Sequence, residues 1–257
     1  MKDPLDFSGR VAIVTGGARG VGRGITDRFL EAGAQVIACG RNVPAEPLRA
    51  GAGEALFVQA DVRELEQIDR VIAAARERFG RLDVLVNNAG GAPAADAATV
   101  SPRFSEGMIR LNLMAPLHFS QRANAVMQRQ EGGGAIVFIT SVTAFRPAPT
   151  AAAYGAAKAG LVSLAASLAV EWAPKVRVNG VAAGMVETEL SHLHYGDAAG
   201  LARVAATVPL GRLARPRDIG DACLFLASPL ASYVSGSTLL VHGGGERPAF
   251  LGAVEKG

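Results

Sequence analysis

The sequence predicts an α/β fold, with a doubly wound parallel sheet of about seven strands flanked by helices in a single domain. Short apolar runs typical of buried strands alternate with helical patterns along the whole chain, and a glycine-rich turn follows the first run directly. The 257 residues are 49% hydrophobic and 19% charged, as in a globular protein, without internal repeats or a second apolar core. Residues 1–257 are therefore expected to form one domain.

Charge and composition narrow the classes of partner. The 26 basic and 23 acidic residues are spread along the chain without a Lys/Arg block or an aromatic stacking platform, which argues against nucleic-acid binding. The N-terminus carries acids and a proline where a signal peptide needs an apolar core, and no run approaches the ~18 apolar residues of a membrane span. Cys39 and Cys223 lie in apolar runs, as buried thiols in a reducing compartment would. We expect a cytoplasmic protein without a membrane partner.

The first strand, Val11–Thr15, passes through Gly16, Gly20 and Gly22 into a helical pattern that reaches Ala32. Glycines let the backbone approach a pyrophosphate closely, and the start of the helix offers free N–H groups and a positive dipole end. This pattern predicts a dinucleotide site. The alternative is a simple turn that leads into a helix.

The second strand, Gln35–Cys39, ends where a nucleotide ribose would lie, and Gly40 and Arg41 follow it. An acid here would bind the ribose 2'-hydroxyl, whereas an uncharged residue followed by Arg leaves room for a 2'-phosphate and supplies a cation. We therefore favour NADP(H), with NAD(H) as the alternative cofactor. Arg19 in the glycine turn is a second candidate contact, and a solvated surface position is the alternative for either arginine.

Prolines and glycines between residues 42 and 55 predict a crossover reduced to a turn or two. The third strand, Leu56–Asp61, ends in an acid that either meets the adenine edge or caps the amphipathic helix Leu65–Phe79. The fourth, residues 84–86, leads into Asn87–Gly90, whose side-chain amides can bind backbone groups and adenosine.

Helical patterns cover Phe104–Asn112 and Ala115–Gln130. Asn112 is a polar amide within the helix, where this residue type is mildly unfavourable, so its presence there indicates a function. The fifth strand, Gly134–Thr140, delivers Ser141 at its carboxyl end, the edge where open parallel sheets bind ligands. Later elements are a strand at residues 176–181, a helix over Asp218–Ala227 and a last strand, residues 238–241.

Tyr154 and Lys158 are four residues apart in a helix predicted over 151–172, so their side chains lie on one face. A tyrosine with a pKa of about 10 is a poor proton shuttle at neutral pH, but a neighbouring ammonium lowers that pKa. The pair therefore predicts general acid/base chemistry.

Apolar residues near these positions predict a pocket for a small to medium carbonyl or secondary alcohol. The candidates are Val142, Phe145, Met185, Leu190 and Leu193. Arg146 either meets an acidic substrate group or has a surface or subunit-contact role. Residues 190–209 are expected to form a substrate lid. We expect no metal site, since His192 and His194 lack helical i, i+4 spacing and no acid or Cys cluster accompanies them.

The chain contains Thr15-Gly16-Gly-Ala-Arg-Gly20-Val-Gly22, then Asn87-Asn-Ala-Gly90, and the tetrad Asn112, Ser141, Tyr154 and Lys158. These motifs resemble those of the short-chain dehydrogenase/reductase family, in its compact single-domain branch, over nearly the whole chain. The segments Pro209-Leu-Gly-Arg, Pro216-Arg-Asp-Ile and Ala231-Ser-Tyr-Val-Ser-Gly are similar to those of its 3-oxoacyl-carrier-protein reductase members.

The resemblance implies an NAD(P)-binding Rossmann domain in which Tyr154 exchanges a proton with the substrate oxygen and Ser141 holds that oxygen. Lys158 would hold the nicotinamide ribose and lower the pKa of Tyr154, Asn112 would anchor a water, and Thr188 would bind the nicotinamide carboxamide. The implied cofactor contacts are Gly16, Arg19, Gly20, Val21, Gly22, Arg41, Asp61, Val62, Asn88, Ala89, Gly90, Tyr154, Lys158, Gly184, Val186 and Thr188.

The resemblance also implies a homotetramer that packs through helices 115–130 and 151–172, with a tail, residues 246–257, that reaches a neighbour. Two positions depart from the family pattern: Ala183 stands for a proline before Gly184, and His242 for an aspartate. The implied substrates are a 3-oxoacyl thioester, a small ketone or a steroid-like compound. The alternative function is a non-catalytic NADP(H)-binding scaffold or redox sensor.

Overall fold

The computed structural model describes residues 3–246 and 248–254 and has a seven-stranded parallel sheet at its centre. The strand order is β5-β2-β1-β6-β7-β8-β9, which confirms the doubly wound fold predicted from the alternating strand and helix patterns. The strands are β1 (Val11–Thr15), β2 (Gln35–Gly40), β5 (Leu56–Gln59), β6 (Val84–Asn87), β7 (Gly134–Ser141), β8 (Val176–Ala183) and β9 (Thr238–Val241). The chain reverses its direction of winding between β1 and β6, and ligands bind at the carboxyl end of such a switch point.

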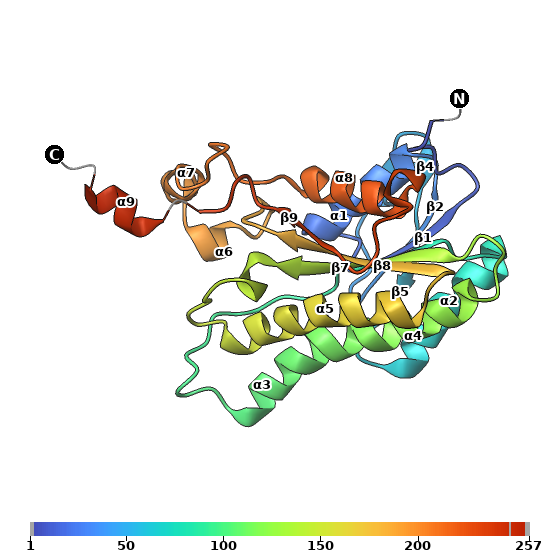
Figure 1. The fold of residues 1–257 in the computed structure, drawn as a ribbon, viewed down its shortest axis with the longest axis horizontal. Helices are drawn as coiled ribbons and strands as arrows, with labels where there is room; N and C mark the ends of the chain where they lie inside the picture. Colours follow the sequence, from blue (N-terminus) through green and yellow to red (C-terminus); the bar gives the residue numbers. More distant parts are fainter. Residues whose placement is uncertain (1–2, 247, 255–257) are drawn as a thin grey trace.

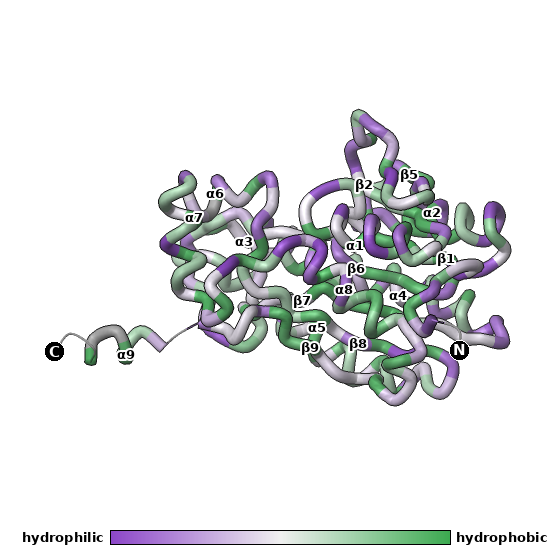
Figure 2. Tube along the Cα trace, turned by 90° about the horizontal axis from the view of Figure 1, so that it is seen from above, coloured by the Kyte–Doolittle hydropathy of each residue, from purple (hydrophilic) through white to green (hydrophobic). Residues whose placement is uncertain are grey.

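Helices cover both faces of the sheet (Figure 1). The helices α1 (Gly20–Glu31) and α8 (Pro216–Ala227) lie on one face, and α2 (Leu65–Phe79), α4 (Ala115–Met127) and α5 (Ala152–Glu171) on the other. Alternate residues of a strand serve the two faces, since Val14 packs with Phe29 of α1 whereas Ile13 packs with the cluster around Phe119 of α4. Figure 2 shows β6, β7 and β8 as largely hydrophobic stretches in the interior.

Short elements complete the fold. They are the 3-10 turns η2 (Val142–Ala144) and η3 (Pro229–Ala231) and the helices α6 (His192–Tyr195), α7 (Ala198–Ala205) and α9 (Ala249–Val254). The last of these, α9, extends away from the rest of the fold in both views (Figures 1 and 2). Cys39 and Cys223 are buried and free, and burial raises the pKa of the Cys39 thiol to about 12.

The connection between β2 and β5 differs from the expected turn or two. It forms a small antiparallel ribbon of β3 (Arg49–Ala50) and β4 (Gly53–Glu54), with Arg49 and Glu54 paired at 2.8 Å. The ribbon packs closely on α1, because a Cβ on Gly53 would lie 3.0 Å from Leu30. The prolines stop a helix from forming here, as predicted, and the ribbon takes its place.

The two helical patterns over Phe104–Asn112 and Ala115–Gln130 form one continuous helix. It begins as α3 (Pro102–Ile109), passes through the π-helical turn η1 (Arg110–Met114) and continues as α4. A π turn inside an α-helix adds a residue to the turn and often marks a functional site. Asn112 lies in this turn, and the sequence indicated the residue without indicating the π geometry.

One expectation about apolar runs is wrong. Among the described residues α5 is long and apolar enough to cross a membrane, with 20 residues and a mean hydropathy of 1.4. One side of it packs against the sheet, with Leu161, Ala165 and Lys158 buried, and 39% of its apolar stretch is buried in all. Its apolarity therefore follows from its place in the fold.

The helix α8 begins two residues earlier than predicted. Pro216 occupies its first turn, where a missing N–H costs nothing, and the Asp218 carboxylate accepts the Arg215 backbone N–H at 2.6 Å. This capping interaction, together with the proline, explains why the helix starts before Asp218.

Candidate active site

The turn between β1 and α1 has the geometry of a phosphate cradle. Gly16 and Gly20 have φ values of 65° and 52°, which favour glycine. A Cβ on Gly22 would lie 2.1 Å from the Gly16 carbonyl oxygen, so no side chain fits there. Arg19 precedes the helix in an extended conformation without a side-chain cap, which leaves the first N–H groups of α1 as donors for a ligand. These features fit a dinucleotide pyrophosphate.

Thr15 joins this turn to the end of β6. Its hydroxyl oxygen accepts the backbone N–H groups of Asn88 and Ala89, each at 2.9 Å. The Asn88 side-chain amide donates to the Thr15 carbonyl, also at 2.9 Å. The predicted contacts Gly16, Asn88 and Ala89 therefore meet at the switch point of the sheet.

The residues after β2 and β5 lie at the side of the sheet where the ribose and adenine were predicted. Arg41 is exposed, and its carbonyl accepts the Gln59 side-chain amide at 2.7 Å. The Asp61 carboxylate binds the Arg63 guanidinium, which holds the pKa of Asp61 below its usual value. Because α2 follows Glu64, the alternative that Asp61 caps this helix is wrong. Val62 is buried in the core between the sheet and α2.

Ser141, Tyr154 and Lys158 meet at the carboxyl end of β7. Ser141 ends the strand, and its hydroxyl oxygen accepts the Thr143 N–H at 3.2 Å. The Ser141 side chain lies near enough to Tyr154 to lower its pKa, against the larger effect of burial. The Lys158 Nζ lies 5.4 Å from the centre of the Tyr154 ring and donates to the Ile139 carbonyl at 2.8 Å. The structure thus brings these three predicted residues together.

The protonation of this cluster differs from the expectation. Burial raises the pKa of Tyr154 above its ordinary value, and the Ser141 side chain only partly opposes this. Burial also lowers the pKa of Lys158 to about 8, since its side chain is 3% exposed. The predicted lowering of the Tyr154 pKa by Lys158 is not found, because desolvation dominates and Nζ is bound to Ile139 rather than to the phenol.

Asn112 is fully buried and holds the chain just beyond β6. Its Oδ1 accepts the Gly91 N–H, and its Nδ2 donates to the carbonyls of Gly91 and Met108. A Cβ on Gly90 would lie 2.6 Å from the Asn112 Oδ1 and 3.5 Å from the Lys158 Nζ. The Gly90 backbone therefore passes between these two predicted site residues.

The loop after β8 returns toward the glycine turn. Val186 forms an isolated parallel bridge with Ala214. The Thr188 N–H donates to the Ser191 hydroxyl at 2.7 Å, and its Cγ2 would lie 3.7 Å from a Cβ on Gly20. The predicted nicotinamide contact Thr188 thus lies beside the predicted pyrophosphate contact Gly20.

Both departures from the family pattern have clear structural positions. Ala183 is the last residue of β8 and pairs with Ser141 of β7 and Val241 of β9. Gly184 donates its N–H to the Val241 carbonyl at 3.0 Å, and a Cβ on Gly184 would lie 2.8 Å from the Cα of His242. His242 therefore packs directly against the start of the predicted nicotinamide loop.

A cavity of about 80 Å³ lies beside Tyr154, between the loop after β6, α3 and the start of α5. Its lining contains none of the six predicted pocket residues. Val142 and Met185 are half-buried elsewhere, and Phe145, Arg146, Leu190 and Leu193 are exposed. The residues that line the cavity are Ala92, Pro93, Ala95, Ala97, Val100, Phe104, Ser105, Met108, Thr150, Ala151, Ala152, Ala153 and Tyr154. The Ala-rich loop after Gly90 was the sequence signal for this lining.

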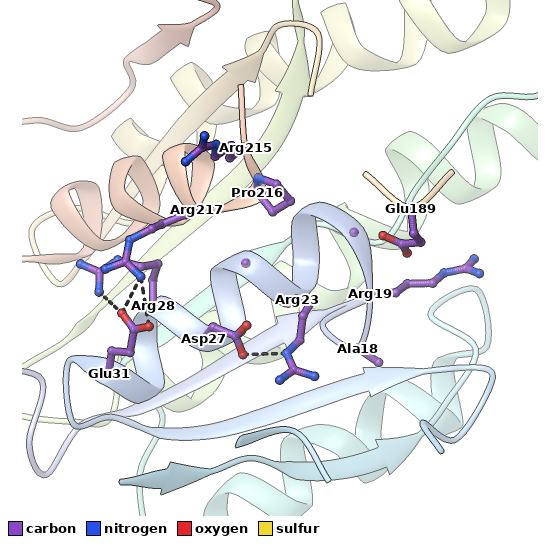
Figure 3. Close-up of a pocket in the computed structure, with 12 residues that line it drawn as sticks. Ala18, Arg19, Arg23, Asp27, Arg28, Glu31, Glu189, Arg215, Pro216 and Arg217 are labelled. Atoms are coloured by element: carbon purple, nitrogen blue, oxygen red, sulfur yellow. Dashed lines mark hydrogen bonds and ion pairs between the residues drawn. The ribbon is translucent and has the colours of Figure 1, made fainter. Parts of the chain in front are cut away.

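A larger cleft of about 570 Å³ lies between α1, the start of α8 and Glu189 (Figure 3). Ion pairs line it: Arg23 binds Asp27 at 2.7 Å, and Arg217 binds Glu31 at 2.9 Å. Of the predicted cofactor contacts only Arg19 and Gly20 border it, and none of the tetrad does. Its size therefore does not make it the reaction site.

Among residues 3–246 and 248–254, no group of three or more His, Cys, Asp or Glu side chains could hold a metal ion. His192 Nδ1 lies 3.1 Å from the Glu189 carbonyl oxygen. The side chain of His194 lies outside the described part of the structure.

Comparisons with known proteins show which chains this one is similar to. A family model described as enoyl-(acyl carrier protein) reductase matches residues 16–246. L-rhamnose 1-dehydrogenase (NAD(P)(+)) of Azotobacter vinelandii is 35% identical over 245 residues, 91% of this chain and 96% of that protein. The 3α-hydroxysteroid dehydrogenase of Mediterraneibacter gnavus is 35% identical over 242 residues, with the same coverage of 91% and 96%. The solved aldohexose dehydrogenase of Thermoplasma acidophilum has a TM-score of 0.87 at 30% identity, covering 93% of this chain and 95% of that one.

Proposed function

Because the chain belongs to the short-chain dehydrogenase/reductase family and is an oxidoreductase, we propose that it transfers a hydride between NADP(H) and a carbonyl or secondary alcohol. Tyr154 acts as the general acid/base. The cluster of Ser141, Tyr154 and Lys158 at the carboxyl end of β7 is the observation that carries this proposal. A protein that only binds a nucleotide does not need a buried lysine close to the ring of a tyrosine, with a serine hydroxyl next to that tyrosine.

The roles of the residues follow from their hydrogen-bonding capacities. The Ser141 hydroxyl donates to the substrate oxygen and holds it beside Tyr154. Tyr154 gives its proton to that oxygen in reduction and takes it back in oxidation. Lys158, positively charged below a pKa of about 8, binds the nicotinamide ribose. Asn112 keeps the Gly90 backbone in place against Lys158 and anchors a water. The cofactor, when bound, supplies or accepts the hydride.

The chain's own residues favour NADP(H). The Gly16–Gly22 turn and the start of α1 bind the pyrophosphate, and Asn88, Ala89 and Gly90 contact the adenosine side. Arg19 and Arg41 bind the 2'-phosphate, since Gly40 presents no carboxylate to a free 2'-hydroxyl. Asp61 and Val62 meet the adenine, and Gly184, Val186 and Thr188 hold the nicotinamide.

The substrate is a small to medium carbonyl compound or alcohol. The cavity beside Tyr154 is lined largely by alanines, so an apolar part of the substrate fits there. The names of the relatives include two sugar dehydrogenases and a hydroxysteroid dehydrogenase. We keep the 3-oxoacyl thioester, the small ketone and the steroid-like compound as candidates, and add the aldose. Residues 190–209, which contain α6 and α7, act as the substrate lid. Of the expected tail, 246–257, residues 247 and 255–257 lie outside the described part of the structure.

We infer that the enzyme is a cytoplasmic homotetramer. The exposed side of α5 carries small residues, including Ala152, Ala156, Ala159 and Ser163, which allow a helix of a second subunit to approach closely. The two buried free thiols fit a reducing compartment. Light scattering at micromolar concentration tests the assembly, since a monomeric mass would remove this inference.

The function is tested by following NADPH oxidation with a panel of ketones and 3-oxoacyl thioesters, and NADP⁺ reduction with aldoses and hydroxysteroids. Tyr154→Phe removes only the phenol hydroxyl, so it should retain NADPH binding and lose turnover by about 10²-fold or more. Cofactor binding is read separately from the fluorescence of bound NADPH. If NADPH binds but no compound gives Tyr154-dependent turnover, the scaffold or redox-sensor alternative is favoured.

A further inference from the structure

Three consecutive glycines follow closely after β9, which ends at the same edge of the sheet as β7 and Ser141. Gly243, Gly244 and Gly245 have φ values of 65°, 97° and 86°, which L side chains rarely adopt. This turn is fixed in place, because Leu210 donates its N–H to the Gly243 carbonyl at 3.0 Å and a Cβ on Gly244 would lie 2.9 Å from Pro209. The next residue is Glu246, so its position depends on a backbone conformation that glycine allows.

Glu246 forms an ion pair with Arg146, which precedes it by 100 residues. Arg146 Nη2 donates to the Glu246 carboxylate at 2.5 Å, and Nη1 donates to the Pro147 carbonyl at 3.2 Å. A guanidinium has five N–H donors, so these two bonds leave others for a ligand. The two side chains are 39% and 36% exposed, and a pair this exposed contributes little to stability.

The ion pair is connected to the reaction centre along the chain and through Tyr195. Arg146 follows Ser141 by five residues, beyond the 3-10 turn η2. Burial raises the pKa of Tyr195 in α6, and the charge of Arg146 opposes this rise while that of Glu246 adds to it. Tyr195 in turn contributes to the raised pKa of Tyr154. Figure 1 shows α6 at the end of the molecule toward which β7 points. Arg146, Glu246 and Tyr195 are therefore near enough to affect one another electrostatically, on the side of the sheet where β7 ends.

We propose that Glu246 neutralises Arg146 at the mouth of the site and that the pair selects a neutral, hydroxyl-bearing substrate over an anionic one. This inference rests on the proposed function and adds the charge class of its substrate.

The chemistry of the pair supports this choice. A lone arginine would bind a substrate carboxylate through two parallel hydrogen bonds. With Glu246 in place, an anionic substrate must displace the Glu246 carboxylate from Arg146. The two negative charges then remain close together and repel each other. A hydroxyl group avoids this conflict because it can donate to Glu246 and accept from Arg146 at once.

The test uses D-glucose and D-glucuronate, which share a ring and differ only in a hydroxymethyl group or a carboxylate. Two quantities are measured: the ratio of kcat/KM for the two sugars in NADP⁺ reduction, and the ratio of their affinities for the NADPH-loaded protein by calorimetry. NADPH cannot accept a hydride, so the second ratio does not depend on turnover. The wild type should favour glucose in both.

Glu246→Gln should shift both ratios toward glucuronate by about tenfold, because it releases a charge-assisted contact from Arg146. The double variant Arg146→Gln/Glu246→Gln should reverse most of that shift, because it has no guanidinium at this position to bind the glucuronate carboxylate. The matched control is Glu54→Gln, which breaks the exposed Arg49–Glu54 pair at 2.8 Å, on the ribbon beside α1, and should leave the ratios unchanged.

Unchanged ratios in Glu246→Gln, or binding of neither sugar by any variant, would overturn the inference. If Glu246→Gln lowers both activities equally, the pair only holds the tail in place and the inference also fails. The proposed function fails separately, through absence of Tyr154-dependent turnover on every compound of the panel, whether or not the affinity ratio shifts.

Discussion

Asn112 binds both backbone polar groups of Gly91, because its Oδ1 accepts the N–H and its Nδ2 donates to the carbonyl, each at a distance of 3.0 Å. A single buried side chain thus fixes the end of β6 to the helix formed by α3, η1 and α4. The same contact positions Gly90 against Lys158. Fold stability and site geometry therefore depend on one amide.

Asn112→Ala should lower the free energy of unfolding by roughly 1–3 kcal/mol, since the fully buried amide and its three hydrogen bonds to part-buried backbone groups of Gly91 and Met108 are lost. Turnover should also fall, because the Gly90 backbone is no longer held against Lys158. Urea denaturation and steady-state kinetics measure the two effects. Asn124→Ala, also in this helix, is the control and should cost about 1 kcal/mol or less. Equal losses of stability and turnover in both variants would contradict the role of the Asn112 hydrogen bonds.

Gly22→Ala should abolish tight NADPH binding and destabilise the protein, because the new Cβ would lie 2.1 Å from the Gly16 carbonyl oxygen and would force the cradle apart. Gly107→Ala in α3 is the matched control. Nothing lies within 4 Å of its new Cβ, so it should stabilise the protein by about 0.5–1 kcal/mol and leave NADPH binding unchanged. Fluorescence titration gives the NADPH affinity of both variants, and thermal denaturation gives their stability. Wild-type affinity in Gly22→Ala would refute the idea that this turn binds the pyrophosphate.

Lys158→Met should stabilise the protein while turnover is lost. The pKa of Lys158 is about 8 in the fold against 10.5 for the free side chain, so the unfolded chain binds the proton more tightly. Below pH 8 this opposes folding by roughly 3 kcal/mol, and loss of the hydrogen bond to Ile139 offsets about 1 kcal/mol of the gain.

The gain in stability should be complete at pH 7 and should decline as the pH rises from about 8 toward 10.5, where both states release the proton. Urea denaturation of both proteins across this range gives the difference. A gain that does not change with pH would mean that Lys158 keeps its ordinary pKa in the fold.

Arg41→Ala should weaken NADPH binding by about tenfold or more and leave NADH binding nearly unchanged, because only NADPH carries the 2'-phosphate. Titration with both nucleotides gives the comparison. Arg129→Ala, an exposed arginine just beyond α4, controls for the general loss of positive charge. Equal weakening for the two nucleotides would remove Arg41 from the phosphate site.

Features that depend on local patterns could be predicted from the sequence. The apolar runs of β1, β2 and β7 and the glycine turn after Thr15 specify their own backbone conformations, and repeated strand–helix units then leave few topologies. Tyr154 and Lys158 were found because four residues on a helix determine their relative position.

Features that depend on long-range packing could not. The cavity beside Tyr154 combines the loop after Gly90 with α3 and the start of α5, and no local pattern relates these segments. The pairing of Arg146 with Glu246, 100 residues later, depends on the three left-handed glycines that precede Glu246. The direction of the Tyr154 pKa shift depends on burial, which outweighs the effect of the neighbouring lysine.

The π turn at Arg110–Met114 means that this helix holds one residue more than a regular α-helical path of equal length. One residue corresponds to a rotation of about 100°, so the apolar face of α4 is offset by that angle from a continuation of α3. This offset explains why the hydrophobic periodicity resembles two helices. Deletion of one residue in this turn would make its hydrogen bonds regularly α-helical, and it would rotate Asn112 away from Gly91. The helix would become more regular, but it would no longer be connected to the reaction site.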